Sequence, residues 1–458
     1  MSAAPTSGGL GAVILAAGLG TRLKSRLPKM LHPLGGRPLV TYAVAAAAAV
    51  SGRPPVLVVG HGGDAVRAAL GAAAVYVEQA APLGTGHAAQ QAAAALRGAA
   101  ELVLVTYGDM PLLTAVTLQA LVAVQRANPG PFSLLSVDAP PLRDFGRIVR
   151  DAAGELLAVV EAHQATAAEY ALTEVNVGAY CFRGGWLWEH LPRLPLSPKG
   201  EYYLTDLVGL AVAAGERVAV VQTDDPAEAI GINNRAQLAE AEAALRRRTN
   251  THWMLAGVTL ADPASTYIEP GVTLQPDTVI LPNTHLQGAT TVGAECVLGP
   301  NTIIRDSVIG DRCRVEASVV EGAALAEDVS VGPFAHLRKG ARLERGAHMG
   351  NFGEVKNSTL GPGVKMGHFS YVGDATIAAE VNIGAGTITC NFDGVKKNPT
   401  VIGAGAFIGS DTLLVAPVSI GAGARTGAGA VVTKDVPPDT LAVGVPARAI
   451  RKLKQAGS

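Results

Sequence analysis

The sequence predicts an α/β nucleotide-binding domain with a mostly parallel, Rossmann-like sheet, followed by a linker helix and a parallel β-helix of hexapeptide repeats. Three observations support this prediction. Up to about residue 232, short apolar runs alternate with alanine-rich segments of helical spacing. Residues 234–248 are rich in alanine, leucine and glutamate, as in a helix. From Gly257 onward an aliphatic residue returns at every sixth position. We therefore expect three parts, at residues 1–232, 233–256 and 257–458.

The first part begins with a short strand that leads into a glycine-rich loop. Ala12–Leu15 is an apolar run typical of a buried parallel strand, and Gly18 and Gly20 follow it. Because glycine has no Cβ, the backbone can bend tightly there, approach a ligand and point its amides at an anion. Arg22 and Lys29 add charge suited to phosphates. The two glycines alone indicate a plain strand-to-helix turn at least as often, and the loop fits neither the dinucleotide nor the Walker pattern.

The whole stretch from Leu15 to Lys29 is more specific than its glycines. It resembles the signature of the sugar-1-phosphate nucleotidyltransferases, L-x-x-G-x-G-T-x-(M/L)-x-x-x-x-P-K, and every fixed position is met, down to Pro28 and Lys29. The strand, the loop and the two cations together indicate a nucleoside triphosphate as the ligand.

The remaining elements of this part alternate along the chain, which predicts a mostly parallel sheet with helices on both faces. In such folds, ligands bind at the carboxyl ends of the strands. The expected strands are Val56–Val59, Val75–Val77, Leu102–Val105 and Ser133–Val137, and the expected helices are Leu39–Val50, Asp64–Leu70, Gly86–Leu96 and Thr117–Gln125.

Polar residues follow two of these strands. Asp109 ends the sequence Tyr107-Gly108-Asp109, which makes it either a Mg²⁺ ligand or a turn cap. Gln79 and a Gly84-Thr85 turn follow another strand, where the backbone either binds a base edge or only turns. Asn233 comes just before the linker helix, near a position where asparagine often serves as an N-cap.

In this order, the motifs resemble the uridyltransferase half of the bifunctional N-acetylglucosamine-1-phosphate uridyltransferase/glucosamine-1-phosphate acetyltransferase family. The resemblance implies UTP and Mg²⁺ as ligands, with Arg22 and Lys29 on the phosphates and Asp109 and Asn233 on the metal. The remaining implied contacts are Leu15, Ala16, Ala17, Gly18, Gln79, Gly84, Thr85, Tyr107 and Gly108 for the nucleotide, and Gly146, Glu161 and Asn176 for the N-acetylglucosamine unit.

Composition excludes several other classes of protein. The 37 lysines and arginines nearly balance the 38 aspartates and glutamates, which gives no support to nucleic-acid binding. The four cysteines are widely scattered and fit no metal spacing, as expected of reduced thiols in a cytoplasmic protein. No signal peptide is expected, and the longest Ala/Val run, Ala43–Val50, is too short to cross a membrane.

The linker helix is expected from Asn234 to Arg248 and ends in three arginines. We interpret this triplet as a solvated helix end favoured by the helix dipole, in preference to a nucleic-acid contact. The helix separates two regions of different composition.

The last part follows a six-residue period. Val331, Leu337, Leu343, Met349 and Val355 keep strict step, and the period resumes in two later runs: Leu360, Met366 and Val372, then Ile402, Ile408, Leu414, Ile420 and Thr426. This pattern is typical of a parallel β-helix in which each six-residue side places one residue inside. Eighteen residues make one three-sided coil, so residues eighteen apart should stack.

Two such pairs are of chemical interest. Arg338 and Lys356 are one coil apart, and two cations this close need an anion, either Glu344 or Glu354 or a sugar phosphate. Ser410 and Ala428 are also one coil apart, as suits a long thin ligand.

His368 lies between these pairs. A lone histidine is more often structural, but a glucosamine amine that attacks a thioester needs a base that titrates near neutrality.

This spacing resembles the acetyltransferase half of the same family, which implies left-handed coils. The resemblance makes His368 the base, with Glu354 supporting it. It places Arg338, Lys356, Tyr371 and Asn382 on glucosamine-1-phosphate, and Ala385, Asn391, Phe392, Ser410, Ala428 and Arg448 on acetyl-CoA. Phe392 stands where the family usually has tyrosine, and the segment Gly444–Arg448 is one residue shorter than the family pattern.

The loop Cys390–Pro399 interrupts the period, so we expect it to protrude from the prism. A prism with small flat sides tends to pack threefold about its axis. The resemblance implies a homotrimer with acetyltransferase sites between subunits.

The leading interpretation is therefore a cytoplasmic enzyme with two activities. It would acetylate glucosamine-1-phosphate from acetyl-CoA and then join the product to UTP, giving UDP-N-acetylglucosamine for cell-envelope precursors. One alternative is a single-activity nucleotidyltransferase whose β-helix only oligomerises, as in enzymes resembling ADP-glucose pyrophosphorylase. A second is an inactive scaffold of the same build.

Overall fold

The computed structural model describes residues 9–138 and 145–452. The chain divides into two compact units, a first unit at residues 1–245 and a second unit at residues 246–458. The division falls within helix α9, Arg235–Leu255, so the predicted linker helix exists but extends beyond Arg248. The arginine triplet is therefore not a helix end. The guanidinium of Arg246 lies 4.8 Å from the ring centre of Tyr267 and is not simply solvated.

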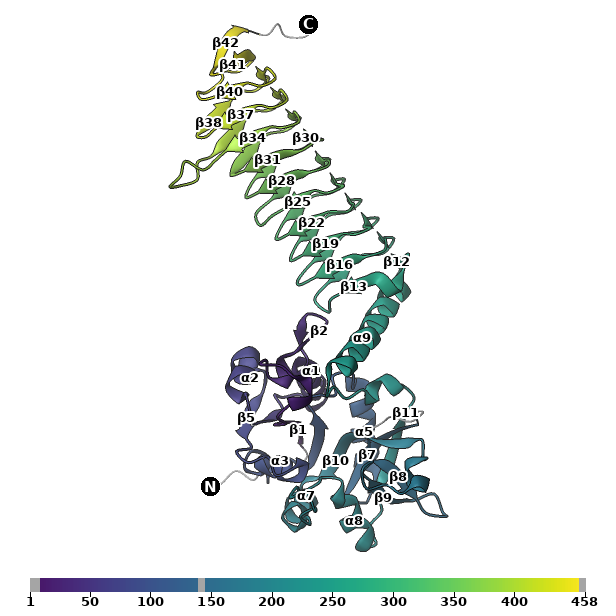
Figure 1. Ribbon diagram of the computed structural model, residues 1–458. Helices are drawn as coiled ribbons and strands as arrows, with labels where there is room; N and C mark the ends of the chain where they lie inside the picture. The colour runs from purple at the N-terminus through teal and green to yellow at the C-terminus, as the bar shows by residue number, and fades with distance from the viewer. Residues whose placement is uncertain (1–8, 139–144, 453–458) are drawn as a thin grey trace, which may run out of the picture. The chain divides into compact units, whose positions relative to one another are not determined.

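The first unit is built on a mostly parallel sheet, which confirms the predicted fold class (Figure 1). Its strand order is β11-β7-β10-β6-β1-β4-β5, and β10 runs antiparallel to both of its neighbours. Strands β8 and β9 form a hairpin that pairs with β10. The bounds are β1 Leu10–Ala16, β4 Val56–Val59, β5 Val75–Glu78, β6 Leu102–Tyr107, β7 Phe132–Asp138, β8 Arg147–Arg150, β9 Leu156–Val160, β10 Glu174–Arg183 and β11 Ala219–Thr223, with a separate hairpin of β2 Pro33–Leu34 and β3 Arg37–Pro38.

Helices cover both faces of this sheet because its central strands are apolar on both sides. In β1, Ala12 and Ile14 belong to the core that includes α1 and α5, whereas Val13 and Leu15 belong to the core that includes α3 and α7. The predicted helix Gly86–Leu96 is instead two helices, because backbone hydrogen bonds at Ala92 tighten to three-residue spacing. The helices are α1 Val40–Ser51, α2 Gly63–Leu70, α3 Thr85–Gln91, α4 Ala93–Leu96, α5 Ala115–Ala127, α6 Ala167–Tyr170, α7 Gly184–His190 and α8 Asp206–Ala213.

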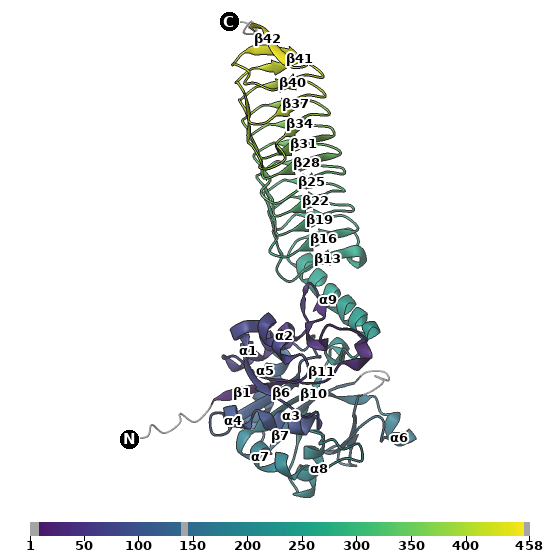
Figure 2. The ribbon, with the colours of Figure 1, turned by 60° about the vertical axis from the view of Figure 1, so that its left-hand side comes forward.

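The second unit is a stack of three-sided coils, and Figure 2 shows the coils lying one above another. Its three stacked parallel sheets are the arrangement typical of a left-handed β-helix. Among the described strands of this second unit, only the last pair, β41 and β42, is antiparallel.

We call the three sheets side 1, side 2 and side 3. Side 1 is β12 Thr259–Leu260, β15 Val279–Ile280, β18 Val297–Leu298, β21 Arg314–Val315, β24 Ser330–Val331, β27 His348–Met349, β30 Lys365–Met366, β33 Asn382–Ile383, β36 Phe407–Ile408, β39 Arg425–Thr426, β41 Thr440–Gly444 and β42 Ala447–Lys452. Side 2 is β13 Thr266–Ile268, β16 Thr284–Gln287, β19 Ile303–Arg305, β22 Val319–Glu321, β25 His336–Leu337, β28 Gly353–Lys356, β31 Ser370–Gly373, β34 Ile388–Cys390, β37 Leu413–Val415 and β40 Val431–Val432. Side 3 is β14 Thr273–Leu274, β17 Thr291–Val292, β20 Val308–Ile309, β23 Ala324–Leu325, β26 Arg342–Leu343, β29 Thr359–Leu360, β32 Ala375–Ile377, β35 Thr400–Ile402 and β38 Val418–Ile420.

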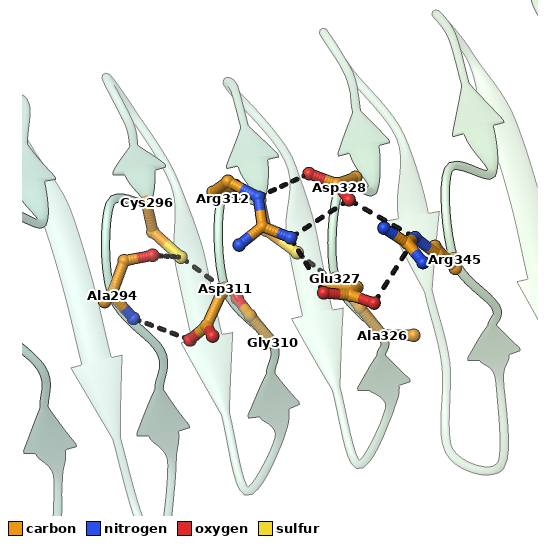
Figure 3. A network of polar contacts seen from close by, with 10 residues as sticks. Ala294, Cys296, Gly310, Asp311, Arg312, Ala326, Glu327, Asp328 and Arg345 are labelled. Carbon is orange, nitrogen blue, oxygen red and sulfur yellow. Dashed lines mark hydrogen bonds and ion pairs between the residues drawn. The ribbon is translucent and has the colours of Figure 1, made fainter.

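The residues that recur at every sixth position form the core of these coils, as predicted. Each residue of the period is buried, from Val331 to Thr426. The corners are held by polar contacts between successive coils (Figure 3). Asp311 accepts a hydrogen bond from the backbone of Ala294 at 2.9 Å, and Arg312 pairs with Glu327 and Asp328 of the next coil.

Candidate functional site

The first unit contains a cleft of about 450 Å³ at the carboxyl ends of β1 and β6. This is the edge at which parallel α/β sheets bind ligands. Most of the predicted nucleotide-site residues line it: Leu15, Ala17, Gly18, Arg22, Lys29, Gln79, Gly84, Thr85, Tyr107, Asp109 and Asn233. Ala16 and Gly108 lie behind this wall, where a Cβ on Gly108 would be 3.2 Å from the Cβ of Ala16.

The glycine loop brings a lysine into the cleft. Gly20 has a φ of 65°, and a Cβ there would lie 2.6 Å from the Cβ of Lys29. Only glycine lets Lys29 pack against the loop, because any side chain would strain the backbone and collide with it. Gly18 differs, since a Cβ there would meet nothing within 4 Å. The absence of a side chain at Gly18 leaves room for a ligand. Arg22 lies in a 3-10 turn at the rim of the cleft.

Three residues far apart in the sequence meet in this cleft. Lys29 Nζ donates to Asp109 Oδ2 at 2.5 Å and to Asn233 Oδ1 at 2.8 Å. The backbone N–H of Ile232 donates to the Asp109 carbonyl at 3.0 Å, which ties the two acceptor-bearing segments together. A carboxylate and an amide oxygen thus converge on one positive charge. The same donor set fits Mg²⁺, which binds few protein oxygens and keeps phosphate and water ligands.

A turn after β5 forms another wall of the cleft. Gln79 Nε2 donates to the carbonyl of Gly84 at 3.0 Å. Thr85 Oγ1 accepts from the backbone of Leu204 at 2.9 Å. The segment around Leu204 therefore straps the turn, and it adds Glu201 and Tyr203 to the lining. These two residues were not assigned in the sequence analysis.

The predicted sugar contacts form a second cluster behind Tyr107. Asn176 donates through Nδ2 to the hydroxyl of Tyr180 at 2.7 Å, and its backbone N–H bonds the carbonyl of Gly146. Glu161 accepts from Thr205 at 3.0 Å. Burial, with the nearby Tyr180 and Glu161, raises the pKa of Tyr107 well above its usual range, so its hydroxyl keeps its proton. Gly146, Glu161 and Asn176 do not line the cleft but adjoin it through Tyr107.

In the second unit, two of the four predicted sugar-phosphate residues, Lys356 and Tyr371, lie on side 2, and Arg338 directly follows a side 2 strand. Glu354 pairs with Tyr371 across β28 and β31, and Arg338 donates to Glu354 at 2.7 Å. Glu354 is thus the anion beside the stacked cations. The neighbouring Lys397 is the main cause that lowers the pKa of Lys356, because like charges disfavour each other. Partial desolvation and the charge of Arg338 lower it further. Three cations therefore gather where the sequence predicts a sugar phosphate.

The corner between sides 1 and 2 carries the predicted base and three of the six predicted coenzyme residues in one column. His368, Ala385, Ser410 and Ala428 each come two residues after the end of a side 1 strand, in four successive coils. Backbone hydrogen bonds connect the corners, such as Gly429 N–H to the Ser410 carbonyl at 2.8 Å. We call these four residues the corner column. His368 is exposed, and no hydrogen bond joins it to Glu354 within the described part of the chain.

The same corner carries three exposed phenylalanines, Phe334, Phe352 and Phe369, at 60%, 61% and 56% exposure, and the last of them shares its coil with His368 of the corner column. Each comes three residues after the end of a side 1 strand, in three successive coils. The rings of Phe334 and Phe352 stack with centres 5.4 Å apart. Three such large apolar side chains in a row are unusual on a free surface. We call them the phenylalanine row.

The remaining predicted residues surround the column. Asn382 lies on side 1 and pairs with Lys365. Asn391 donates to Asp374 at 2.5 Å, and Phe392 begins an exposed loop, which confirms the predicted protrusion. Arg448 lies on β42, opposite Val443.

Three further features of the described residues complete this account. Within residues 9–138 and 145–452, no three His, Cys, Asp or Glu side chains gather into a metal site. A metal ion there would therefore also need oxygen atoms from a bound substrate or water. In the same residues, no helix has the length and apolar character needed to cross a membrane. All four cysteines are free thiols.

Comparison with known families agrees with both halves. Residues 12–176 match the MobA-like NTP transferase domain. Residues 399–434 match the bacterial transferase hexapeptide (six repeats), and residues 289–320 match the hexapeptide repeat of succinyl-transferase.

Full-length relatives share this organisation. The chain is 48% identical to the bifunctional protein GlmU of Trichlorobacter lovleyi over 94% of this chain and 95% of the relative. It is 44% identical to that of Brevibacillus brevis and 46% identical to that of an Exiguobacterium species, again over 94% of the chain and over 94% and 96% of the relatives. The chain therefore belongs to the family of the bifunctional protein GlmU, the uridyltransferase and acetyltransferase family that its motifs resemble.

Proposed function

We propose that the two activities divide between residues 1–232 and 257–458, on either side of the linker 233–256. The first part would transfer a uridylyl group from UTP to N-acetylglucosamine-1-phosphate. The second part would acetylate glucosamine-1-phosphate from acetyl-CoA. The observation that carries the first assignment is the meeting of Lys29, Asp109 and Asn233 in one cleft beside a glycine loop.

In uridylyl transfer, a phosphate oxygen of the sugar attacks the α-phosphorus of UTP. A P–O bond forms, the bond to the β-phosphate bridge breaks, and pyrophosphate leaves. Arg22 and Lys29 neutralise the growing negative charge, which is the main task in such reactions. Mg²⁺, held by Asp109 and Asn233, would supply further positive charge at the phosphates. Gln79, Gly84 and Thr85 would hold the uracil, and Gly146, Glu161 and Asn176 the sugar.

In acetyl transfer, the glucosamine nitrogen attacks the thioester carbon. A C–N bond forms, the C–S bond breaks, and coenzyme A leaves as the thiol. His368 takes the proton from the amine. Arg338 and Lys356 hold the phosphate, with Tyr371 and Asn382 on the sugar. The coenzyme runs along the corner column past Ala385, Ser410 and Ala428, with Asn391, Phe392 and Arg448 as further contacts.

We also propose that the acetyltransferase site is completed by neighbouring copies in a homotrimer. His368 is exposed in a single chain, and the phenylalanine row beside it offers an apolar strip for a second copy. Phe352→Ser should shift the assembly toward monomer in analytical ultracentrifugation and reduce acetyl transfer. Unchanged mass would contradict this. A cytoplasmic location, where UTP and acetyl-CoA are available, agrees with four free thiols.

Substrate omission and two variants test the assignments. Product should require glucosamine-1-phosphate, acetyl-CoA, UTP and Mg²⁺ together. His368→Ala should abolish acetyl transfer and spare uridylyl transfer, whereas His348→Ala, a histidine on the same prism, should leave both. Asp109→Ala should remove only uridylyl transfer. If acetyl transfer survives in His368→Ala, the prism would be only an oligomerisation element. If neither variant loses the activity assigned to it, both proposed sites are contradicted.

A further inference from the structure

The turn that walls the cleft contains a histidine whose role is not yet accounted for. His87 lies in the first turn of α3 and is half-buried. Its Nδ1 is 3.0 Å from Gln79 Nε2. Gln79 itself lines the cleft and is only 7% exposed, so its carboxamide is confined by its neighbours.

These contacts fix which atom of Gln79 faces the ligand. The carbonyl of Gly84 can only accept a hydrogen bond, so the group 3.0 Å from it must be the Gln79 NH₂. The second N–H of the same nitrogen is directed at His87 Nδ1, which accepts it as the lone pair of a neutral imidazole. Both donors of the carboxamide are then used within the protein. Within the described residues no protein donor contacts Gln79 Oε1, which is left as an acceptor for the cleft.

Gln91 contacts His87 from one helical turn later. Its carboxamide nitrogen donates to the His87 carbonyl at 3.0 Å. The same nitrogen lies 3.2 Å from His87 Nε2, but because Nδ1 accepts from Gln79, the ring proton is on Nε2, and this second approach is a contact between two donors and not a hydrogen bond. The hydrogen bond of Nδ1 to Gln79 is therefore the one that orients the ring.

We propose that His87 is a positioning residue for base selection: by accepting from Gln79, it keeps the Gln79 carbonyl oxygen turned toward the base. Uracil carries an N–H donor at N3, and cytosine carries a lone pair there. A fixed acceptor at this position favours the first base and repels the second. Without His87, one donor of the carboxamide loses its partner, and the group can rotate to offer its NH₂ instead. The proposal rests on the proposed binding of uracil by Gln79.

The test compares UTP with CTP as substrates of the full-length enzyme. The measured quantity is the ratio of kcat/KM for UTP to kcat/KM for CTP, with pyrophosphate release as the readout. His87→Leu should lower this ratio about fivefold, the weight of one hydrogen bond, mainly through a higher KM for UTP. His87→Asn should restore the ratio to within about twofold, because its Oδ1 can take the place of Nδ1 as the acceptor. Should His87→Leu fail to fold, His87→Phe keeps the ring without the lone pair and makes the same comparison.

Two further variants separate the possible outcomes. His190→Leu changes another half-buried histidine of the same unit that lies outside the cleft, so the ratio should stay at the parent value. Gln79→Leu tests the underlying uracil site and should raise the KM for UTP. If Gln79→Leu has no effect, the proposed base site is wrong. If Gln79→Leu weakens UTP binding while His87→Leu and His87→Phe leave the ratio unchanged, the role of His87 is overturned and the base site stands.

Discussion

Replacing Gly178 by alanine should damage uridylyl transfer from a position that no substrate needs to touch. Gly178 lies in β10 with a φ of 86°, in the left-handed region. A Cβ there would lie 2.7 Å and 2.8 Å from Cε2 and Cδ2 of Tyr107. Ordinary contact begins near 3.4 Å, so the ring would have to move by 3.4 − 2.7, or 0.7 Å. Tyr107 lines the cleft and also adjoins the sugar cluster.

The expected magnitude has two parts. Alanine in the left-handed region costs about 1–2 kcal/mol, which for a unit of this size lowers the melting temperature by roughly 2–8 °C. A displacement of this order in an active site reduces kcat/KM by roughly 10- to 100-fold. Acetyl transfer, in the other unit, should be unaffected.

Pyrophosphate release and thiol release, measured on the same preparation, check both halves of this prediction. Gly209→Ala is the matched control, because Gly209 lies in α8 and a Cβ there meets nothing within 4 Å. That change should leave activity intact and stabilise the helix by about 0.5–1 kcal/mol. The reasoning is refuted if Gly178→Ala keeps uridylyl transfer within twofold of the parent enzyme.

Four other substitutions have clear expected outcomes. Gly20→Ala should lower uridylyl transfer at least tenfold by pushing Lys29 away from Asp109, whereas Gly18→Ala should fold normally and raise the KM for UTP; equal effects on KM and kcat in both would contradict the distinction. Leu360→Ala, at a fully buried position of the prism, should cost about 2–5 kcal/mol in urea unfolding of the second unit, and a loss under about 1 kcal/mol would argue against a close-packed core. Burial acts to raise the pKa of Glu174, but hydrogen bonds from Arg150 and Ser136 and the charge of Arg150 outweigh it, so the pKa is lowered. Its stabilising contribution is therefore present at neutral pH and is lost as pH falls below the usual glutamate range, and in Glu174→Gln the melting temperature should depend less on pH in that acid window.

The periodic parts of this fold could be predicted from sequence because each period reports burial directly. The six-residue steps from Val331 to Val372 and from Ile402 to Thr426 identified the inward residues of the coils that they span. The apolar runs identified the central strands, and Val56–Val59 was predicted with the bounds of β4. Strand ends then located Asp109, since parallel strands bring their carboxyl ends to one edge.

Contacts between distant segments could not be predicted in the same way. Nothing local in Gly200–Asp206 indicates that it straps the turn at Gly84, because that contact depends on the packing of the sheet. The cut of the helix at Ala92 also escaped prediction, since a run of alanines favours helix throughout. Phe334 and Phe352 adopt positive φ at coil corners, where sequence rules expect glycine or asparagine. The corner column was predicted only in part: the eighteen-residue spacing placed Ser410 and Ala428 one coil apart, whereas the loop Cys390–Pro399 breaks that spacing between Ala385 and Ser410.

The coil geometry makes the length of the prism adjustable in whole steps. Val279 pairs with Val297, so removing residues 279–296 would join Thr278 to the equivalent point of the next coil. All candidate acetyl-transfer residues lie at position 338 or later in the chain, so they would keep their neighbours. An excision of four or five residues would instead turn each later side to a new face and scatter the aligned groups. Insertions and deletions tolerated over evolution should therefore fall at corners or span complete turns of the prism.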